Sequence, residues 1–348
     1  MNRTIIIFLI LSLVTGTFLV IMSNHWFPIW LGLELSTLSI IPILNTNINP
    51  RSNEATIKYF LVQAFSAAIL LNGAIINLWQ SNTWNINETL STICYIIILS
   101  ALIIKLGLAP FHFWFPDVLS GIPFSNGIII ACWQKIAPLY LLLLTSNNIP
   151  NEIILTCATT SVLIGGWGGL NQTSLRKILA YSSISHLGWI SATLFFSQEI
   201  ALLIFLFYIL NNTAIFLICH NNNLYSLSNL NKTNTTPSTT ILFSTLILSI
   251  GGLPPLGGFL NKLIPLNIFL NNINIIFILV FIFGSLTSLY FYLRIVFNTS
   301  LTLFPNNSLI ILLNNPQSTN NTTNLIISIT LPLSIWGITL TPIFWLFI

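Results

Sequence analysis

Residues 105–121 read KLGLAPFHFWFPDVLSG, and residues 251–258 read GGLPPLGG. Both stretches interrupt long apolar runs with glycine, which frees the backbone, and with proline, which removes a helical hydrogen-bond donor. Each run is therefore predicted to form a broken helix. Non-helical backbone at membrane depth is tolerated only where protein or water surrounds it. We therefore expect both breaks to lie inside a helical bundle.

Composition places the rest of the chain in lipid. Of 348 residues, 55% are hydrophobic and only 5% are charged, whereas soluble domains carry about 25% charged residues. The chain is interpreted as a single polytopic membrane domain over 1–348. Its first apolar run, 4–22, has no convincing cleavage site and is interpreted as a span, not a signal peptide. The net charge of +4 is spread along the chain, so no nucleic-acid partner is expected.

Hydropathy predicts an all-α membrane protein with about eleven transmembrane helices. They cover 4–22, 26–46, 55–80, 91–121, 123–145, 151–170, 175–197, 199–220, 238–266, 272–298 and 324–347. In this map the loop cations fall on the same side of the membrane as the N-terminus: Arg3, Arg51, Arg176, Lys177, Lys232 and Arg294. The carboxylates Glu88, Glu152 and Glu199 fall on the other side. The positive-inside rule therefore predicts an inner N-terminus and an outer C-terminus.

The two breaks occupy matching places in the span order. One lies in the fourth of spans 1–5 (about 4–145), and the other in the fourth of spans 6–10 (about 151–298), with a final helix at about 324–347. This predicts two five-helix repeats, and because five is odd the second must be inverted. Inverted repeats with broken helices are typical of ion-coupled transporters. The alternative is that the prolines fall at matching places by chance.

Four of the charged residues within the predicted spans are interpreted as intramembrane charges. Glu34 is near the centre of the second, Lys105 inside the fourth, Lys135 near the centre of the fifth, and Lys262 after the break in the ninth. A charge at mid-bilayer costs about 2.5–3.5 kcal/mol, so these groups are predicted to face the bundle interior, pair or border water. Glu34 and Lys105 are interpreted as partners, either as a proton-loading pair or as a static ion pair that fixes packing.

His186 lies in the middle of the seventh span, within the serine-rich run AYSSISHLGW. That span is the repeat counterpart of the second, so His186 is expected at a place similar to that of Glu34. Histidine titrates near neutrality and passes protons along hydroxyls and water. The two interpretations are a proton relay and a hydrogen-bonded core histidine.

Other polar and small residues are given structural interpretations. Asp117 and His112 flank the first break and are interpreted as helix caps, while Lys58 is expected to reach the inner face with its ammonium group. The run GGWGG at 165–169 is predicted to permit close helix packing. The four cysteines lie in apolar runs without a CxxC pair, and no GxGxxG, P-loop, HExxH or CxxCH motif occurs. No catalytic residue, cofactor site or metal site is predicted.

Several of these motifs together resemble a known family. They are KLGLAPFHFWFPDV (105–118), WQKIAP (133–138), GGWGGLNQTSLRKILAYSSISHLGW (165–189) and GGLPPLGGFLNK (251–262). From about residue 32 to 294 the chain is similar to subunit 2 of mitochondrial NADH dehydrogenase, the antiporter-like membrane subunit of respiratory complex I. The resemblance implies that Glu34, Lys105, Lys135 and Lys262 match the central glutamate and lysines of that family, with His186 on the connecting polar axis.

The resemblance also implies a function and a setting. A proton-translocating core subunit of NADH:ubiquinone oxidoreductase would couple quinone reduction elsewhere in the complex to proton pumping. It would lie in the mitochondrial inner membrane, with its N-terminus on the matrix side and its C-terminus on the intermembrane-space side. Its partners would be other membrane-arm subunits, including antiporter-like neighbours, which together with the rest of the complex bind NADH, FMN, iron–sulfur clusters and ubiquinone. The alternatives are a non-pumping scaffold subunit and a stand-alone cation/proton antiporter.

Overall fold

The computed structural model describes residues 3–46, 49–86, 91–146, 151–230, 237–272 and 275–301, together with Ser328 and Pro332. The predicted final helix at 324–347 lies outside this part except for those two residues, as do Glu88 and Lys232. Apart from two isolated β-bridges, the regular structure of the described residues is helical. The chain divides into two compact units, Met1–Cys157 and Ala158–Ile348.

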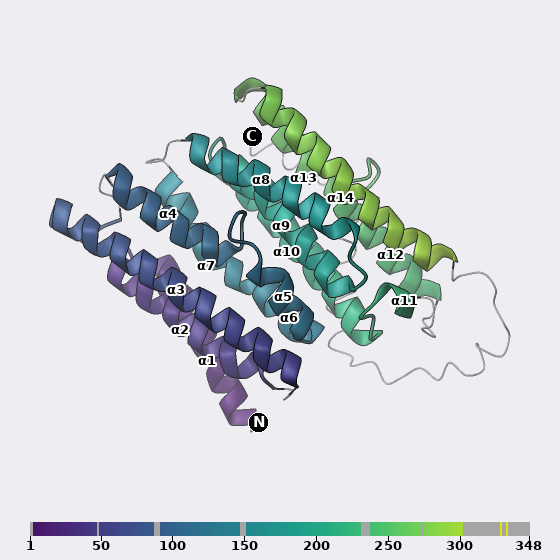
Figure 1. Cartoon of the computed structure of the whole chain (residues 1–348), viewed down its shortest axis with the longest axis horizontal. Helices are drawn as coiled ribbons and strands as arrows, with labels where there is room; N and C mark the ends of the chain where they lie inside the picture. The colour runs from purple at the N-terminus through teal and green to yellow at the C-terminus, as the bar shows by residue number, and fades with distance from the viewer. Residues whose placement is uncertain are drawn as a thin grey trace. The chain divides into compact units, whose positions relative to one another are not determined.

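The first unit contains the helices predicted as spans one to five. Its elements are α1 (Arg3–Met22), α2 (Trp26–Leu44), α3 (Pro50–Ser81), α4 (Thr92–Leu106), α5 (Trp114–Gly121), α6 (Phe124–Ala131), the 3-10 turn η1 (Trp133–Lys135) and α7 (Ile136–Thr145). Helices α1, α2 and α3 pack in sequence order, α2 between the other two (Figure 1). Helix α8 (Asn151–Leu170) crosses from the first unit into the second.

Local chemistry sets the helix ends and breaks in this unit. Asn49 forms a capping box with Ser52, whose hydroxyl accepts the Asn49 backbone N–H at 3.0 Å, and Pro50 occupies the first helical position of α3, where its missing donor costs nothing. The predicted break in the fourth span is confirmed between α4 and α5. The turn η1 in the fifth span was not predicted. It precedes Pro138, whose ring excludes the regular helical position of the carbonyl four residues earlier.

The second unit contains the helices predicted as spans seven to ten. Its elements are α9 (Leu175–Leu194), α10 (Gln198–Asn221), α11 (Leu227–Leu230), α12 (Pro237–Gly251), the 3-10 turn η3 (Gly257–Phe259), α13 (Leu260–Asn272) and α14 (Ile275–Leu301). The predicted break in the ninth span is confirmed between α12 and α13.

Among the described residues, seven helices are long and apolar enough to cross a membrane. They are Arg3–Met22, Trp26–Leu44, Pro50–Ser81, Phe124–Thr145, Glu152–Leu170, Gln198–Asn221 and Ile275–Thr299. Helix α9 is not one of them, although it has 20 residues. Its residues are nearly all buried from Ile178 to Leu194, including several serines. A helix surrounded by protein does not need the apolar surface that lipid contact demands.

Glycine allows a close approach of two helix pairs, one in each unit. A Cβ on Gly16 of α1 would lie 2.7 Å from the Gly32 carbonyl oxygen and 3.0 Å from the Ser36 nitrogen of α2. A Cβ on Gly165 of α8 would lie 2.8 Å from the Tyr181 oxygen and 2.7 Å from the Ser185 nitrogen of α9. The three residues of the second contact each lie 149 positions after those of the first. The two helix pairs therefore pack in the same register.

The remaining glycines of GGWGG confirm the predicted close packing. A Cβ on Gly166 would meet the Thr287 hydroxyl of α14, and one on Gly169 would lie 2.8 Å from the Phe291 ring of the same helix. Helix α8 thus uses Gly165 and Gly168, which faces the Tyr181 ring, against α9, and Gly166 and Gly169 against α14. Trp167, between them, is 73% exposed.

The isolated bridges repeat the same register. In the first unit His25 pairs with Asn85, and the Trp26 N–H donates to the Trp84 carbonyl at 3.0 Å. In the second unit the corresponding pair is Ser174 with Ser226, and the Leu175 N–H donates to the Tyr225 carbonyl at 3.1 Å. His25 and Ser174 are again 149 positions apart, whereas their partners Asn85 and Ser226 are 141 positions apart. Each bridge ties the start of one helix, α2 or α9, to a later loop.

Candidate functional site

The first helix break begins at a glycine with a left-handed backbone. Gly107 has a φ of 73° and directly follows α4. The Leu108 N–H donates to the Ile103 carbonyl at 3.1 Å, and the Gly107 N–H donates to the Ile104 carbonyl at 3.2 Å. This pattern, a Schellman motif, satisfies carbonyls that a helix end would otherwise leave without donors. Helix α4 therefore ends in an ordered way inside the bundle.

The second break uses the same motif. Gly252, directly after α12, has a φ of 80°. The Leu253 N–H donates to the Leu248 carbonyl at 3.4 Å, and the Gly252 N–H donates to the Ser249 carbonyl at 3.0 Å. The sequences that follow the two helices, GLAP from Gly107 and GLPP from Gly252, are nearly identical. Both breaks are thus built from the same local chemistry.

Lys105 lies in the last turn of α4, two residues before the first break. Its side chain is 5% exposed, and among the described residues its Nζ has no hydrogen-bond partner. The carboxylate that acts on it electrostatically is Glu34 of α2. A buried ammonium without a hydrogen-bonded partner is costly.

Glu34 is half-buried and accepts a hydrogen bond from the Thr37 hydroxyl at 3.3 Å. The sequence predicted that Glu34 and Lys105 are partners. The structure brings the two groups within electrostatic reach of each other, but it does not join them in a direct ion pair. The Thr37 hydroxyl, one turn further along α2, also donates to the Glu34 backbone carbonyl, at the shorter distance of 2.9 Å.

Lys135 ends the 3-10 turn η1 and is 2% exposed. Its Nζ lies 4.3 Å from the centre of the Phe115 ring, a cation–π contact with the first turn of α5. Such a contact offsets part of the cost of burying the ammonium group. Lys135 therefore contacts the helix that follows the first break, which the sequence did not reveal.

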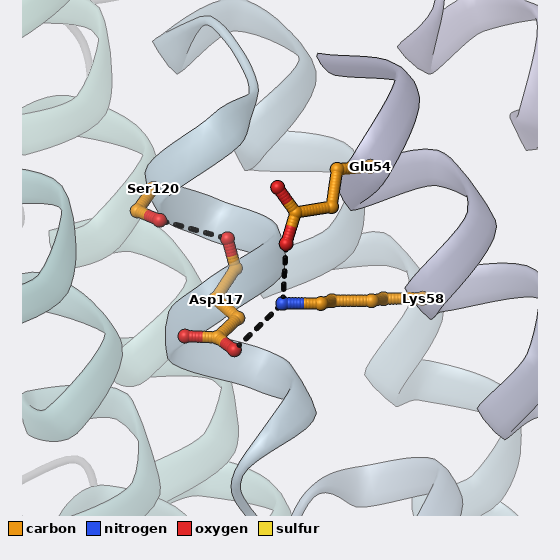
Figure 2. A network of polar contacts seen from close by, with 4 residues as sticks. All are labelled: Glu54, Lys58, Asp117 and Ser120. Atoms are coloured by element: carbon orange, nitrogen blue, oxygen red, sulfur yellow. Dashed lines mark hydrogen bonds and ion pairs between the residues drawn. The ribbon is translucent and has the colours of Figure 1, made fainter. Parts of the chain in front are cut away.

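A third lysine of this unit, Lys58, has two carboxylate partners. Figure 2 shows its ammonium between Glu54, at 2.7 Å, and Asp117, at 3.2 Å. Glu54 and Lys58 are one turn apart on α3, whereas Asp117 lies in the first turn of α5. The interpretation of Lys58 as a cation reaching the inner face missed this network, as did that of Asp117 as a cap. The signal available was the i, i+4 spacing of Glu54 and Lys58.

In the second unit, His186 lies on α9 with its ring 6.1 Å from that of Tyr208 on α10. The register of the glycine contacts sharpens the prediction made for this histidine. His186 lies 149 positions after Thr37, not after Glu34. His186 therefore corresponds to Thr37, whose hydroxyl binds the Glu34 carboxylate, and it lies one helical turn from the counterpart of Glu34.

Lys262 lies in the first turn of α13, and its Nζ donates a 2.7 Å hydrogen bond to the carbonyl of Gly251, the last residue of α12. The lysine thus spans the second break and caps the preceding helix end. Helix α13 packs on α9, where the Phe269 and Trp189 rings stack with centres 6.0 Å apart. His186 and Lys262 therefore lie on neighbouring helices of one unit.

Two known protein-family models match most of the chain. Residues 23–288 match the family model described as "NADH:quinone oxidoreductase/Mrp antiporter, TM", and residues 289–345 match "NADH dehydrogenase subunit 2 C-terminus". The chain belongs to the family of NADH-ubiquinone oxidoreductase chain 2. As a member it is an antiporter-like, multi-pass membrane subunit of complex I, which implies a role in proton translocation.

Relatives of this family cover nearly the whole chain. NADH-ubiquinone oxidoreductase chain 2 of Pisaster ochraceus is 44% identical over 99% of both chains. That of Paracentrotus lividus is 51% identical over 88% of this chain and 87% of its own. These mitochondrial homologues imply the inner mitochondrial membrane.

Solved structures share the fold. A chain of respiratory complex I from Thermus thermophilus matches 98% of this chain and 80% of its own length, with a TM-score of 0.83 at 24% identity. A chain of the Mrp complex from Dietzia sp. matches 82% of this chain and 59% of its own, with a TM-score of 0.73 at 20% identity. The chain therefore has the antiporter-like transmembrane fold.

Proposed function

We propose that this subunit moves protons through Glu34, Lys105, Lys135, His186 and Lys262. The observation that carries the proposal is the state of Lys105, which is buried, without a hydrogen-bond partner among the described residues and close to a carboxylate. Such an ammonium is stabilised by a charged Glu34 and destabilised by a neutral one. The charge on Glu34 therefore controls whether Lys105 holds its proton.

The proposed coupling starts from this pair. Quinone reduction elsewhere in the complex would shift the pairing of Glu34 and Lys105, which would change the proton affinity of Lys105, Lys135 and Lys262 in turn. His186 would connect the two halves along the polar axis. Because Lys262 binds the end of α12 across the second break, loss or gain of its proton would also alter the hydrogen bonding of that helix end.

The five groups would be arranged by an inverted repeat within one membrane domain of eleven spans. The first repeat would cover about 4–145 and the second about 151–298, with a last helix at about 324–347. Three observations support it: the glycine contacts recur 149 positions apart, each unit has a β-bridge from the start of α2 or α9 to a later loop, and both breaks carry the same Schellman motif. An odd number of helices in the first repeat requires the second to have the opposite orientation.

Orientation and partners follow from the same proposal. The described loop cations, Arg3, Arg51, Arg176, Lys177 and Arg294, would face the matrix, as would the N-terminus, and the C-terminus would face the intermembrane space. The subunit would contact other membrane-arm subunits, including antiporter-like neighbours. Redox cofactors and ubiquinone would be bound by other subunits. Among the described residues no cluster of three or more His, Cys, Asp or Glu residues is placed to hold a metal.

The test is Lys105→Met in the assembled complex, with Lys177→Met, at the start of α9, as the matched control. We expect Lys105→Met to lower the number of protons pumped per electron while the complex still assembles. The measurement is proton uptake by sealed vesicles against NADH oxidation, with assembly followed on native gels. An unchanged proton-to-electron ratio in Lys105→Met would favour the scaffold function instead.

A further inference from the structure

Tyr59 is a buried hydroxyl that the proposed set of charged groups does not include. It lies on α3, is 1% exposed, and among the described residues its hydroxyl has no hydrogen-bond partner. Its ring lies 6.0 Å from that of Trp114, and the Trp114 indole N–H donates to the Ile104 carbonyl at 3.1 Å. Ile104 directly precedes Lys105, so these contacts place Tyr59 beside the end of α4 that carries the lysine.

Glu34 acts electrostatically on both groups, the Tyr59 hydroxyl and the Lys105 ammonium. The first unit thus holds one carboxylate with two buried donors around it, and neither donor has a protein partner among the described residues. Buried polar atoms are nearly always hydrogen-bonded to protein or to ordered water. A buried water usually makes two to four hydrogen bonds, so one water could serve both donors and the carboxylate.

The second unit carries the same tyrosine. Tyr208 lies 149 positions after Tyr59, the offset that relates the glycine contacts and that separates His25 from Ser174. At this offset buried residues of α3 match buried residues of α10: Ala55 and Ile204, Thr56 and Phe205, Gln63 and Asn212, Ala67 and Phe216. Tyr208 contacts His186, the counterpart of Thr37, which binds Glu34. Each unit therefore places a tyrosine beside the titratable group of the neighbouring helix.

We propose that Tyr59 is a positioning residue of proton transfer, whose hydroxyl holds a water molecule between Glu34 and Lys105, and that Tyr208 is its counterpart at His186. The inference rests on the proposed function of Glu34 and Lys105. In the transfer, an N–H bond of the Lys105 ammonium breaks as the bridging water accepts the proton and gives one of its own to Glu34. The products are a neutral amine and a neutral carboxyl group. The phenol keeps its proton and only orients the water.

The experiment compares Tyr59→Phe with Tyr95→Phe in the assembled complex. Both substitutions remove one hydroxyl and keep the ring, and Tyr95 is equally buried on α4, ten residues before Lys105. We expect Tyr59→Phe to slow coupled proton transfer about two- to tenfold, the effect of one lost hydrogen bond, and Tyr95→Phe to leave it unchanged. Tyr208→Phe should give a loss of the same order.

A spectroscopic readout separates positioning from structural support. The infrared difference band between oxidised and reduced complex that disappears in Glu34→Gln belongs to the Glu34 carboxyl group. It should shift in Tyr59→Phe and remain in place in Tyr95→Phe. A Tyr59→Phe complex with an unshifted band and unchanged pumping would overturn the inference. If Lys105→Met also pumps normally, the proposed function fails with it. If Lys105→Met fails to pump, only the role of Tyr59 is lost.

Discussion

The two helix breaks share a backbone but not an electrostatic setting. Gly107 and Gly252 end their helices with the same pair of hydrogen bonds. Lys105 lies before the first break, buried and near Glu34, whereas Lys262 lies after the second and reaches back to the Gly251 carbonyl. The charge on Lys105 thus depends on a titratable neighbour. That on Lys262 depends on the negative end of a helix, which does not titrate.

The register of the two breaks makes this difference sharper. Aligning Gly107 with Gly252 places Asp117 opposite Lys262. One unit therefore has a carboxylate where the other has an ammonium, and each is used differently. Asp117 binds Lys58 of α3, while Lys262 binds the helix end before the break. Two breaks with the same backbone motif thus carry charged groups that are held in different ways.

The largest expected effect comes from removing the titratable neighbour. Glu34→Gln deprives Lys105 of its carboxylate and leaves Lys262 bound to Gly251. Because an uncompensated buried charge is strongly disfavoured, we expect coupled proton transfer to fall about tenfold or more. The measurement is the number of protons pumped per electron in vesicles. The control is Glu199→Gln, which neutralises an exposed carboxylate. If the Glu34→Gln complex pumps as well as the Glu199→Gln complex, Lys105 does not depend on Glu34, and the proposed difference between the two breaks is wrong.

Alanine at the two glycines should distinguish the breaks. Each substitution forces a side chain into left-handed backbone, at about 1–2 kcal/mol. At Gly252 the new Cβ would also lie 3.0 Å from the Cδ of Lys262, whereas at Gly107 its nearest neighbour, the Phe115 Cβ, is 3.4 Å away. We therefore expect similar losses of thermal stability and a greater loss of pumping in Gly252→Ala. Equal pumping in both variants would show that Lys262 does not depend on the geometry of its break.

A smaller effect is expected at the counterpart of Lys262. Asp117→Asn removes one of the two carboxylates around Lys58 and leaves the Glu54 pair at 2.7 Å. Because these side chains are largely exposed, the loss should be slight, with faster hydrogen exchange in α5 and almost unchanged pumping. Exchange measured by mass spectrometry on the assembled complex tests this. A large loss of pumping would instead place Asp117 among the groups that carry protons.

The sequence predicted the helical elements and their breaks because these depend on local rules. Long apolar runs specify spans, and the combination of glycine and proline after Lys105 and after Ile250 specifies an interruption. It also identified the five ionisable residues, since charges within apolar runs are conspicuous. The roles of those five residues, the final helix and the orientation remain predictions.

What the sequence did not predict depends on contacts between helices. The position of Lys135 over Phe115 and the bond from Lys262 to Gly251 require the three-dimensional course of the chain around each break. Tyr59 was missed because a tyrosine in an apolar span is usually a core residue with an ordinary role. The ion pair between Lys58 and Asp117 joins residues 59 positions apart. The sequence around Asp117 contains no pattern that predicts this pair.

The bridges at His25 and Ser174 bear on how the molecule responds to a change in charge. Each fastens the start of α2 or α9 to a later loop through backbone hydrogen bonds. A piston-like slide of either helix by one turn, about 5.4 Å, would break those bonds. An axial shift of α2 or α9 is therefore disfavoured as a way to transmit a change in charge. Signals that reach Glu34 or His186 would travel onward through side-chain rotation and shifting water, over distances shorter than one helical turn.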